Sequence, residues 1–241
     1  MCNKIIRSIG ICVLPIIIYL AIGAILSVFI SEPVVTTLIA DVILAALASF
    51  YYIKFIRENM DSDNGNVKFK KDWFHLFLIT MGLWLITQIT VVWYYTTFGD
   101  PLLDNYNAAR NGNLILYLLL TLFIAPVAEE LLIRGIMFPS LKQICKPAVA
   151  AILSSVVFSM LHGTIVHMIV GMYCGLFFTL VFEYTGKLRF PIFTHILYNT
   201  FTIAFSDISL PAWFFKTPFI LVCNMGVILV FAWLMEKINK I

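Results

Sequence analysis

Two adjacent carboxylates and a guanidinium interrupt an otherwise almost entirely apolar stretch of this chain. Glu129, Glu130 and Arg134 fall within residues 114–138, where nearly every other side chain is hydrophobic. Each such group costs roughly 2.5–3.5 kcal/mol at the centre of a bilayer on insertion scales. Three of them together therefore indicate side chains that face a protected or hydrated interior and have a function there.

The positions of Glu129 and Glu130 around the helix predict different roles for the two carboxylates. Glu130 and Arg134 are four residues apart and share one helix face, so they can form an ion pair. Glu129 is rotated by about 100° from Glu130 around the helix axis. The sequence therefore predicts a structural anion at Glu130, and a carboxylate at Glu129 that is free for acid–base chemistry.

Two further polar clusters follow on later apolar segments. Phe158 and His162 are four residues apart, and so are His195 and Asn199. Taken singly, each has an ordinary structural interpretation, because membrane histidines and asparagines often bond a neighbouring helix and Phe158 fits a core. Together with the carboxylates and Arg134, they exceed what helix packing needs. The combination predicts one site between three helices, with Phe158 packing beside it.

Amide hydrolysis is the reaction that this set of groups fits. It needs an activated water, a group that stabilises the oxyanion and a proton donor for the leaving amine. We assign Glu129 as the base, His162 as its partner on the water, and His195 and Asn199 as oxyanion donors. No metal is required. The alternative is a zinc site, because Glu129, His162 and His195 are acceptable ligands with a fourth position left for water.

Other polar residues receive weaker assignments. No HExxH sequence is present, so the zinc hypothesis rests on ligand types alone. His167 fits none of the clusters and is interpreted as a turn residue. Asp41 lies in another apolar segment and is expected to be distant from the site. Pro126, three residues before Glu129, lacks a backbone donor and predicts a kink in its helix.

Composition defines the environment of these groups. Hydrophobic residues make up 61% of the 241 residues and charged residues 12%, with a mean hydropathy of +0.97. Soluble domains are about 45–50% apolar and about 25% charged. The chain is therefore predicted to be a multi-pass protein of the cell membrane, with the bilayer around it. The net charge of +3 gives no reason to expect a nucleic-acid partner.

The apolar segments predict an all-α, polytopic bundle. A helix needs about 20 apolar residues to cross the hydrocarbon, and the fifth and seventh segments are short for that. We expect a single membrane domain over residues 1–241, with residues 114–205 as its catalytic core. The segments predict about eight transmembrane helices: Ile9–Ile30, Val34–Ile53, Trp73–Trp93, Leu114–Phe138, Ala148–Leu161, Val166–Phe182, Ile192–Phe205 and Thr217–Met235.

Charge predicts the orientation of this bundle. With eight helices, both termini lie on one side of the membrane. If that side is the cytosol, cytosolic segments hold all of the 16 basic residues except Arg110, Arg134 and Lys216. Basic residues collect on the cytosolic side of membrane proteins. Both termini are therefore predicted to be cytosolic.

The motifs Glu-Glu-x-x-x-Arg, Phe-x-x-x-His and His-x-x-x-Asn, in this order, resemble the signature of the CPBP intramembrane proteases. This family, also called Abi, unites type II CAAX prenyl endopeptidases with bacteriocin-processing and immunity proteins. The resemblance covers roughly residues 114–205, and Gly135 and the run from Pro191 to Asn199 also match. It implies an intramembrane endopeptidase that acts on a membrane-associated peptide or protein. It also implies that Glu129 and His162 activate water without a metal.

Two other classes remain open. A non-catalytic membrane scaffold, or a bacteriocin self-immunity protein of the same fold, would keep the site and survive substitution of its residues. A small channel or transporter would use Glu129 as a proton or cation site. The chain shows no internal repeat, which disfavours a transporter.

Overall fold

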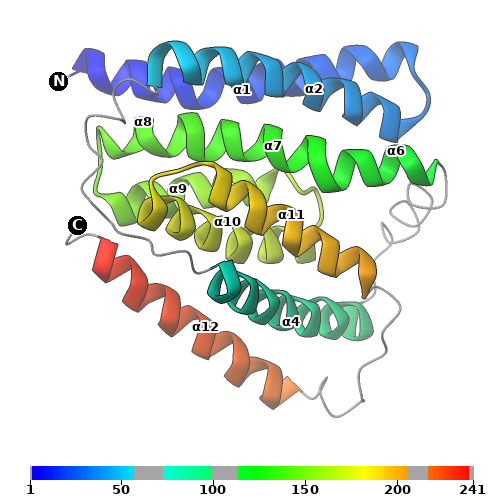
Figure 1. Cartoon of the computed structure of the whole chain (residues 1–241), viewed down its shortest axis with the longest axis vertical. Helices are drawn as coiled ribbons and strands as arrows, with labels where there is room; N and C mark the ends of the chain where they lie inside the picture. Colours follow the sequence, from blue (N-terminus) through cyan, green and yellow to red (C-terminus); the bar gives the residue numbers. More distant parts are fainter. Residues whose placement is uncertain (1, 57–72, 99–112, 206–216, 239–241) are drawn as a thin grey trace.

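The chain forms a bundle of eight helical rods in the computed structural model, which describes residues 2–56, 73–98, 113–205 and 217–238 (Figure 1). No strand occurs in these ranges, so the predicted all-α fold is confirmed. The rods are α1 (Cys2–Phe29), α2 (Pro33–Tyr51) with its extension η1 (Tyr52–Ile56), α4 (Trp73–Phe98), a continuous rod from Leu114 to Lys142, α9 (Pro147–Met160), α10 (Ile165–Thr185), α11 (Arg189–Ala204) and α12 (Thr217–Ile238).

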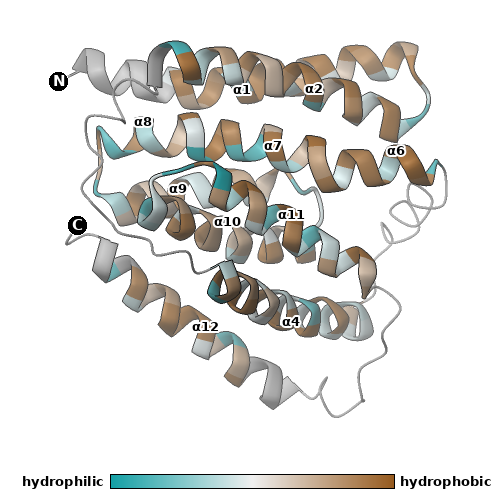
Figure 2. Cartoon of the chain, viewed as in Figure 1, coloured by the Kyte–Doolittle hydropathy of each residue, from teal (hydrophilic) through white to brown (hydrophobic). Residues whose placement is uncertain are grey.

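Length and composition make this a multi-pass integral membrane protein. Within the described ranges, five segments are long and apolar enough to cross a bilayer: Gly10–Phe29, Pro33–Lys54, Trp73–Phe98, Leu114–Lys142 and Ile165–Thr185. Helices α9 and α11, with 14 and 16 residues, are shorter, as expected for the fifth and seventh segments. Hydrophobic residues cover most of the helices in Figure 2, and hydrophilic residues interrupt α7 and α11.

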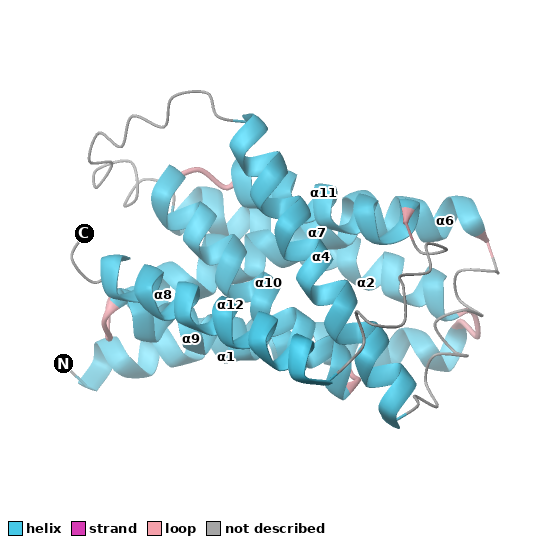
Figure 3. Cartoon of the chain, turned by 90° about the horizontal axis from the view of Figure 1, so that it is seen from below, coloured by secondary structure: helices cyan, strands magenta, loops and turns pink. Residues whose placement is uncertain are grey.

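The rods pack side by side in layers, as two perpendicular views show (Figures 1 and 3). Helices α1 and α2 form one outer layer, α4 and α12 lie at the opposite side, and the remaining helices fill the middle. Among the five candidate spans, α10 is the most enclosed and α1 the least. The start of α1 and the end of α12 lie at the same end of the bundle, as an even number of crossings requires.

Small residues bring α9 and α10 into close contact. A Cβ atom added at Gly175 would lie 2.8 Å from the Cβ of Ser155, and one added at Gly171 would lie 3.0 Å from the Cα of Ser159. Glycines four residues apart allow membrane helices to approach at backbone distance. This contact fixes the helix that carries Phe158 against the helix that binds Arg134.

The rod from Leu114 to Lys142 begins with α6 (Leu114–Leu119) and is widened before Pro126. A π-helical segment, η2 (Leu120–Ile124), precedes α7 (Ala125–Glu130). A proline ring clashes with the carbonyl four residues earlier in an α-helix and has no N–H to donate. Here the N–H of Ala125 bonds the carbonyl of Leu120, five residues back. The kink predicted at Pro126 therefore takes the form of a wide turn.

The same arrangement recurs directly after the carboxylates. A second π-helical segment, η3 (Leu131–Met137), precedes α8 (Phe138–Lys142), where Pro139 is the second residue. The N–H of Phe138 bonds the carbonyl of Ile133, again five residues back. Wide turns of this kind occur frequently at functional sites. The two carboxylates therefore lie on a short α-helical segment between two wide turns.

Candidate active site

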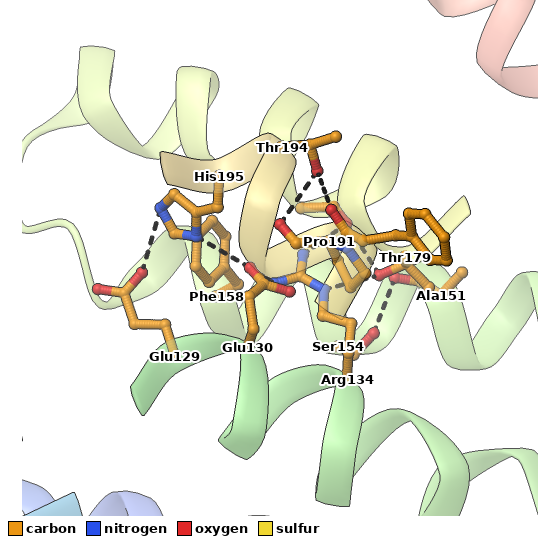
Figure 4. A network of polar contacts seen from close by, with 12 residues as sticks. Glu129, Glu130, Arg134, Ala151, Ser154, Phe158, Thr179, Pro191, Thr194 and His195 are labelled. Carbon is orange, nitrogen blue, oxygen red and sulfur yellow. Dashed lines mark hydrogen bonds and ion pairs between the residues drawn. The ribbon is translucent and has the colours of Figure 1, made fainter. Parts of the chain in front are cut away.

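Arg134 is the centre of a fully buried polar network (Figure 4). Its Nη1 donates to Glu130 Oε1 at 2.8 Å, and both side chains are 0% exposed. Its Nη2 donates to the Gly175 carbonyl at 2.7 Å, and its Nε donates to Thr179 Oγ1 at 3.3 Å. Three hydrogen bonds on α7 and α10 hold the guanidinium in one orientation, so Glu130 is fixed as a paired anion.

Phe158 is the common neighbour of the charged and imidazole groups. Its ring centroid lies 4.8 Å from the guanidinium carbon of Arg134, 4.8 Å from the His162 ring and 5.9 Å from the His195 ring. Both histidines meet it edge-on. A cation over an aromatic face is stabilised by the ring quadrupole. The phenylalanine therefore does more than fill the core, because it sets the spacing between groups from three helices.

His195, on α11, lies between the two carboxylates. Its Nδ1 is 2.9 Å from Glu130 Oε1, and its Nε2 is 3.7 Å from Glu129 Oε2 (Figure 4). A carboxylate accepts hydrogen bonds, so Nδ1 carries the hydrogen and donates it to Glu130. The ring stacks on Phe178 with centroids 4.7 Å apart and planes 23° apart. These contacts aim Nε2 at Glu129.

The two carboxylates have different environments. The side chain of Glu129 is 26% exposed, whereas that of Glu130 is sealed. The second oxygen of Glu130, Oε2, is buried without a hydrogen-bond partner. The 3.7 Å between Oε2 of Glu129 and Nε2 of His195 exceeds hydrogen-bond range and is that of an ion pair. Glu129 is thus the carboxylate that solvent or a substrate can reach.

His162 reaches the site through Phe158. Its Nδ1 is 2.8 Å from the Phe158 carbonyl, which can only accept, so Nδ1 carries the hydrogen and Nε2 is an acceptor in the neutral ring. Among the described residues, no hydrogen bond or ion pair joins His162 to Glu129 or His195. The structure therefore brings Glu129 and His195 into direct proximity, and His162 contacts the same Phe158 ring as His195.

Asn199, one turn after His195 on α11, contacts the backbone of the carboxylate-bearing rod. Its Nδ2 donates to the carbonyl of Thr121 in η2 at 2.9 Å. Asn199 was predicted to donate to the oxyanion. One of the two N–H groups of its side-chain amide donates to Thr121 instead. His167 lies in the first turn of α10, where its Nδ1 is 2.6 Å from Oγ1 of the capping residue Thr164.

The expectation that Asp41 lies away from the site is wrong. Asp41 is 2% exposed on α2, which packs against α7 and η3. It hydrogen-bonds the hydroxyl of Tyr19 on α1 and interacts electrostatically with Glu129. A lone carboxylate in an apolar span is the sequence signal for such a residue. Its position beside Glu129 depends on how α2 crosses the rod, which helix periodicity does not encode.

The ligands of the zinc hypothesis do not converge in the described part of the chain. No group of three or more His, Cys, Asp or Glu side chains there has the geometry to hold a metal ion. Nδ1 of His195 bonds Glu130, which leaves Nε2 as the ring atom available to a ligand. A catalytic zinc would need Glu129, His162 and His195 to place donor atoms at about 2.0–2.2 Å from one point.

The fold and the site together define a multi-pass membrane protein with a buried Glu–Arg–His network. Residues 111–201 match the family model of type II CAAX prenyl endopeptidases, described as Rce1-like. This segment contains all three motifs, so the match confirms the resemblance inferred from them.

Two relatives match parts of the chain. One is the Bacillus subtilis (strain 168) protein titled "Putative membrane peptidase YdiL", 28% identical over 88 residues, which are 36% of this chain and 36% of that protein. The other is an uncharacterized protein of Mycoplasma capricolum subsp. capricolum, 30% identical over 101 residues, 40% of this chain and 29% of that protein. The matches thus span about a third of these relatives. No solved structure matches significantly.

Proposed function

We propose that this chain is an intramembrane endopeptidase of the CAAX type, which hydrolyses a peptide bond in a membrane-associated peptide or protein. The contact that carries the proposal is His195 bridging an accessible carboxylate, Glu129, and a sealed one, Glu130. The family match over residues 111–201 supports the same reaction class. A bundle in lipid gains no packing advantage from such a set of groups.

The network can move one proton without changing its total charge. With Glu129 ionised and His195 protonated, the two carboxylates balance His195 and Arg134. With Glu129 protonated and His195 neutral, Glu130 alone balances Arg134. Both forms are neutral overall, so neither adds a net charge to the low-dielectric interior. A proton can therefore pass between Glu129 and Nε2 of His195 at little electrostatic cost.

The form with Glu129 ionised and His195 protonated can carry out each step of amide hydrolysis. Glu129 takes a proton from a water molecule, and the resulting hydroxide attacks the carbonyl carbon of the substrate. The protonated Nε2 of His195 donates to the oxyanion that forms. Glu129 then gives its proton to the amide nitrogen as the carbon–nitrogen bond breaks. His162 contributes Nε2 as a second acceptor for the water, because its Nδ1 is held by the Phe158 carbonyl.

The test is a Glu129→Gln chain expressed at the level of the original chain. Comparing membrane peptides from cells that carry either chain identifies substrates, and cleavage is then measured in proteoliposomes. We expect turnover to fall by about 10²–10⁴-fold, the range for a lost acid–base group. Protein stripped by a chelator and shown to be free of zinc should keep its activity.

Glu183→Gln is the matched control. Glu183 is a carboxylate of α10 that pairs with Lys142 at 2.5 Å and does not contact the site. We expect its turnover to stay within about threefold of the original, because partly exposed pairs contribute little. A folded Glu129→Gln chain that cleaves at the original rate would refute Glu129 as the base. Identical membrane peptides with and without the original chain would refute the peptidase and favour the scaffold or immunity function. Flux through proteoliposomes that depends on Glu129 would favour a transporter.

A further inference from the structure

The wide turn before Pro126 leaves one backbone carbonyl of the rod without a helical partner. In an α-helix the carbonyl of Thr121 accepts from the N–H of Ala125. In this chain that N–H bonds Leu120 instead. In the π-helical pattern the donor to Thr121 would be residue 126, which is a proline and has no N–H. Helical geometry therefore offers no donor to Thr121 from the rod.

Asn199 supplies that donor from another helix. Its Nδ2 lies 2.9 Å from the Thr121 carbonyl, and the side chain is half-buried. An unsatisfied carbonyl inside a membrane bundle costs several kcal/mol, so a cross-helix donor at this point has a structural purpose. The bond occurs where α11 crosses the wide turn η2. One turn earlier on α11, His195 contacts both carboxylates.

We propose that Asn199 is a positioning residue that replaces the hydrogen-bond donor missing at Pro126, and thereby fixes α7 and its Glu129 against His195. The proposal rests on the peptidase function proposed above. It differs from the assignment of Asn199 as a donor to the oxyanion. Two points connect α11 to the carboxylate rod: His195 on Glu130 and Asn199 on Thr121. A single bond would leave the rod free to rotate about it, whereas two bonds fix its rotation and the gap between Glu129 and Nε2.

A double-mutant cycle between Asn199→Ala and Pro126→Ala separates these roles. Alanine at position 126 returns an N–H to the rod, five residues after Thr121, where it can bond the free carbonyl. If Asn199 acts through Thr121, Asn199→Ala should lower kcat in the original chain. In a chain that already carries Pro126→Ala, the same substitution should lower kcat only slightly. We expect Asn199→Ala alone to lower kcat about tenfold with KM unchanged, the order of one hydrogen bond. In the Pro126→Ala background the loss should shrink to about threefold or less.

Thermal unfolding of the same four proteins in detergent gives a readout that needs no substrate. The midpoint should drop on Asn199→Ala in the original chain and drop less in the Pro126→Ala background. The unfolding midpoints can be compared even if the original chain cleaves no peptide, so failure of the proposed function and failure of the hydrogen-bond replacement are distinguishable. Thr200→Ala is the control on α11, because Thr200 is exposed and its hydroxyl bonds Ile196 of the same helix. It should change neither quantity.

Each other outcome overturns the proposal. An equal loss of kcat in both backgrounds would show that Asn199 acts directly on the reacting atoms. Coupled unfolding midpoints without any change in kcat would show a purely structural bond. A Pro126→Ala chain that is folded but inactive would also contradict it, because the restored N–H should then have served in place of Asn199.

Discussion

Arg134 shows how one residue can determine a whole site. It donates to Glu130, Gly175 and Thr179, and its guanidinium lies over Phe158. Lysine could not reproduce this planar, multidirectional pattern. The ion pair at Glu130 was predictable from the four-residue spacing. The bonds to α10 were not, because they depend on how two helices cross.

Replacing Arg134 should be among the most destabilising changes in the chain. Arg134→Met leaves the buried Glu130 without its guanidinium partner and with the N–H of His195 as its remaining donor, which costs about 3–5 kcal/mol by analogy with broken buried ion pairs. Adding Glu130→Gln removes the uncompensated charge and should recover part of that loss. Denaturation in mixed micelles measures the free energy of unfolding of the single and of the double variant. If the double variant is as unstable as Arg134→Met, the penalty does not come from the lone carboxylate.

Sequence spacing predicts some contacts of the site and not others. Contacts within one helix, such as Glu130 with Arg134 and His162 with the Phe158 carbonyl, follow from a separation of four residues. Contacts between helices do not. The bond between His195 and Glu130, and the approach of Asp41 to Glu129, depend on distances between rods that no local pattern specifies.

At the scale of helices, the contact between α9 and α10 is directly connected to the site, so a shift of one helix against the other would move residues that bind Arg134. Gly175 has no room for a side chain against Ser155, and its carbonyl accepts from Arg134. The pattern of small residues four apart was visible in the sequence, but the partner helix was not. The π-helical turns were likewise only partly predictable. Pro126 indicates a distortion, yet its form depends on the donor that α11 provides.

Gly175→Ala should separate α9 from α10. The new Cβ would lie 2.8 Å from the Ser155 Cβ, so a backbone shift is required, at about 1–3 kcal/mol. Because Arg134 bonds the Gly175 carbonyl, turnover should fall as well. Gly82→Ala on α4, where nothing lies within 4 Å of the added Cβ, is the control and should be neutral. Ser155→Gly should partly rescue Gly175→Ala, and failure to do so would place the strain elsewhere.

Helix α1 is attached to the bundle by few buried contacts, and the bond from Tyr19 to Asp41 is one of them. Tyr19→Phe removes the hydroxyl and leaves a buried carboxylate short of a donor, which costs about 1–3 kcal/mol. We expect a lower unfolding midpoint in detergent, and a small change in turnover because Asp41 interacts electrostatically with Glu129. Tyr94→Phe on α4 serves as a tyrosine control. An unchanged midpoint for Tyr19→Phe would show that the bond contributes nothing to the attachment of α1.

At the scale of the whole molecule, the bundle predicts which loops face which compartment. Composition and hydrophobic segments were enough to predict eight rods and to identify the short ones, because these properties are additive along the chain. The enclosure of α10 and the exposure of α1 are properties of the assembled bundle, and the hydrophobic content of the two segments does not distinguish them.

Labelling of single cysteines tests the orientation. In a chain without its five native cysteines, Ser31→Cys lies between α1 and α2, and Lys187→Cys lies between α10 and α11. With cytosolic termini, an impermeant maleimide should label Ser31→Cys in intact cells and Lys187→Cys after permeabilisation alone. The reverse pattern would place the termini outside and overturn the charge-based orientation.

The gap between Glu129 and His195 has one consequence for a protein that works inside an energised membrane. A proton crossing it travels 3.7 Å, roughly a tenth of the hydrocarbon thickness of about 30 Å. A full crossing of one elementary charge is worth about 2.3 kcal/mol per 100 mV, so this step experiences at most about 0.3 kcal/mol per 100 mV. Peptide hydrolysis by this chain should therefore proceed at nearly the same rate in polarised and depolarised cells.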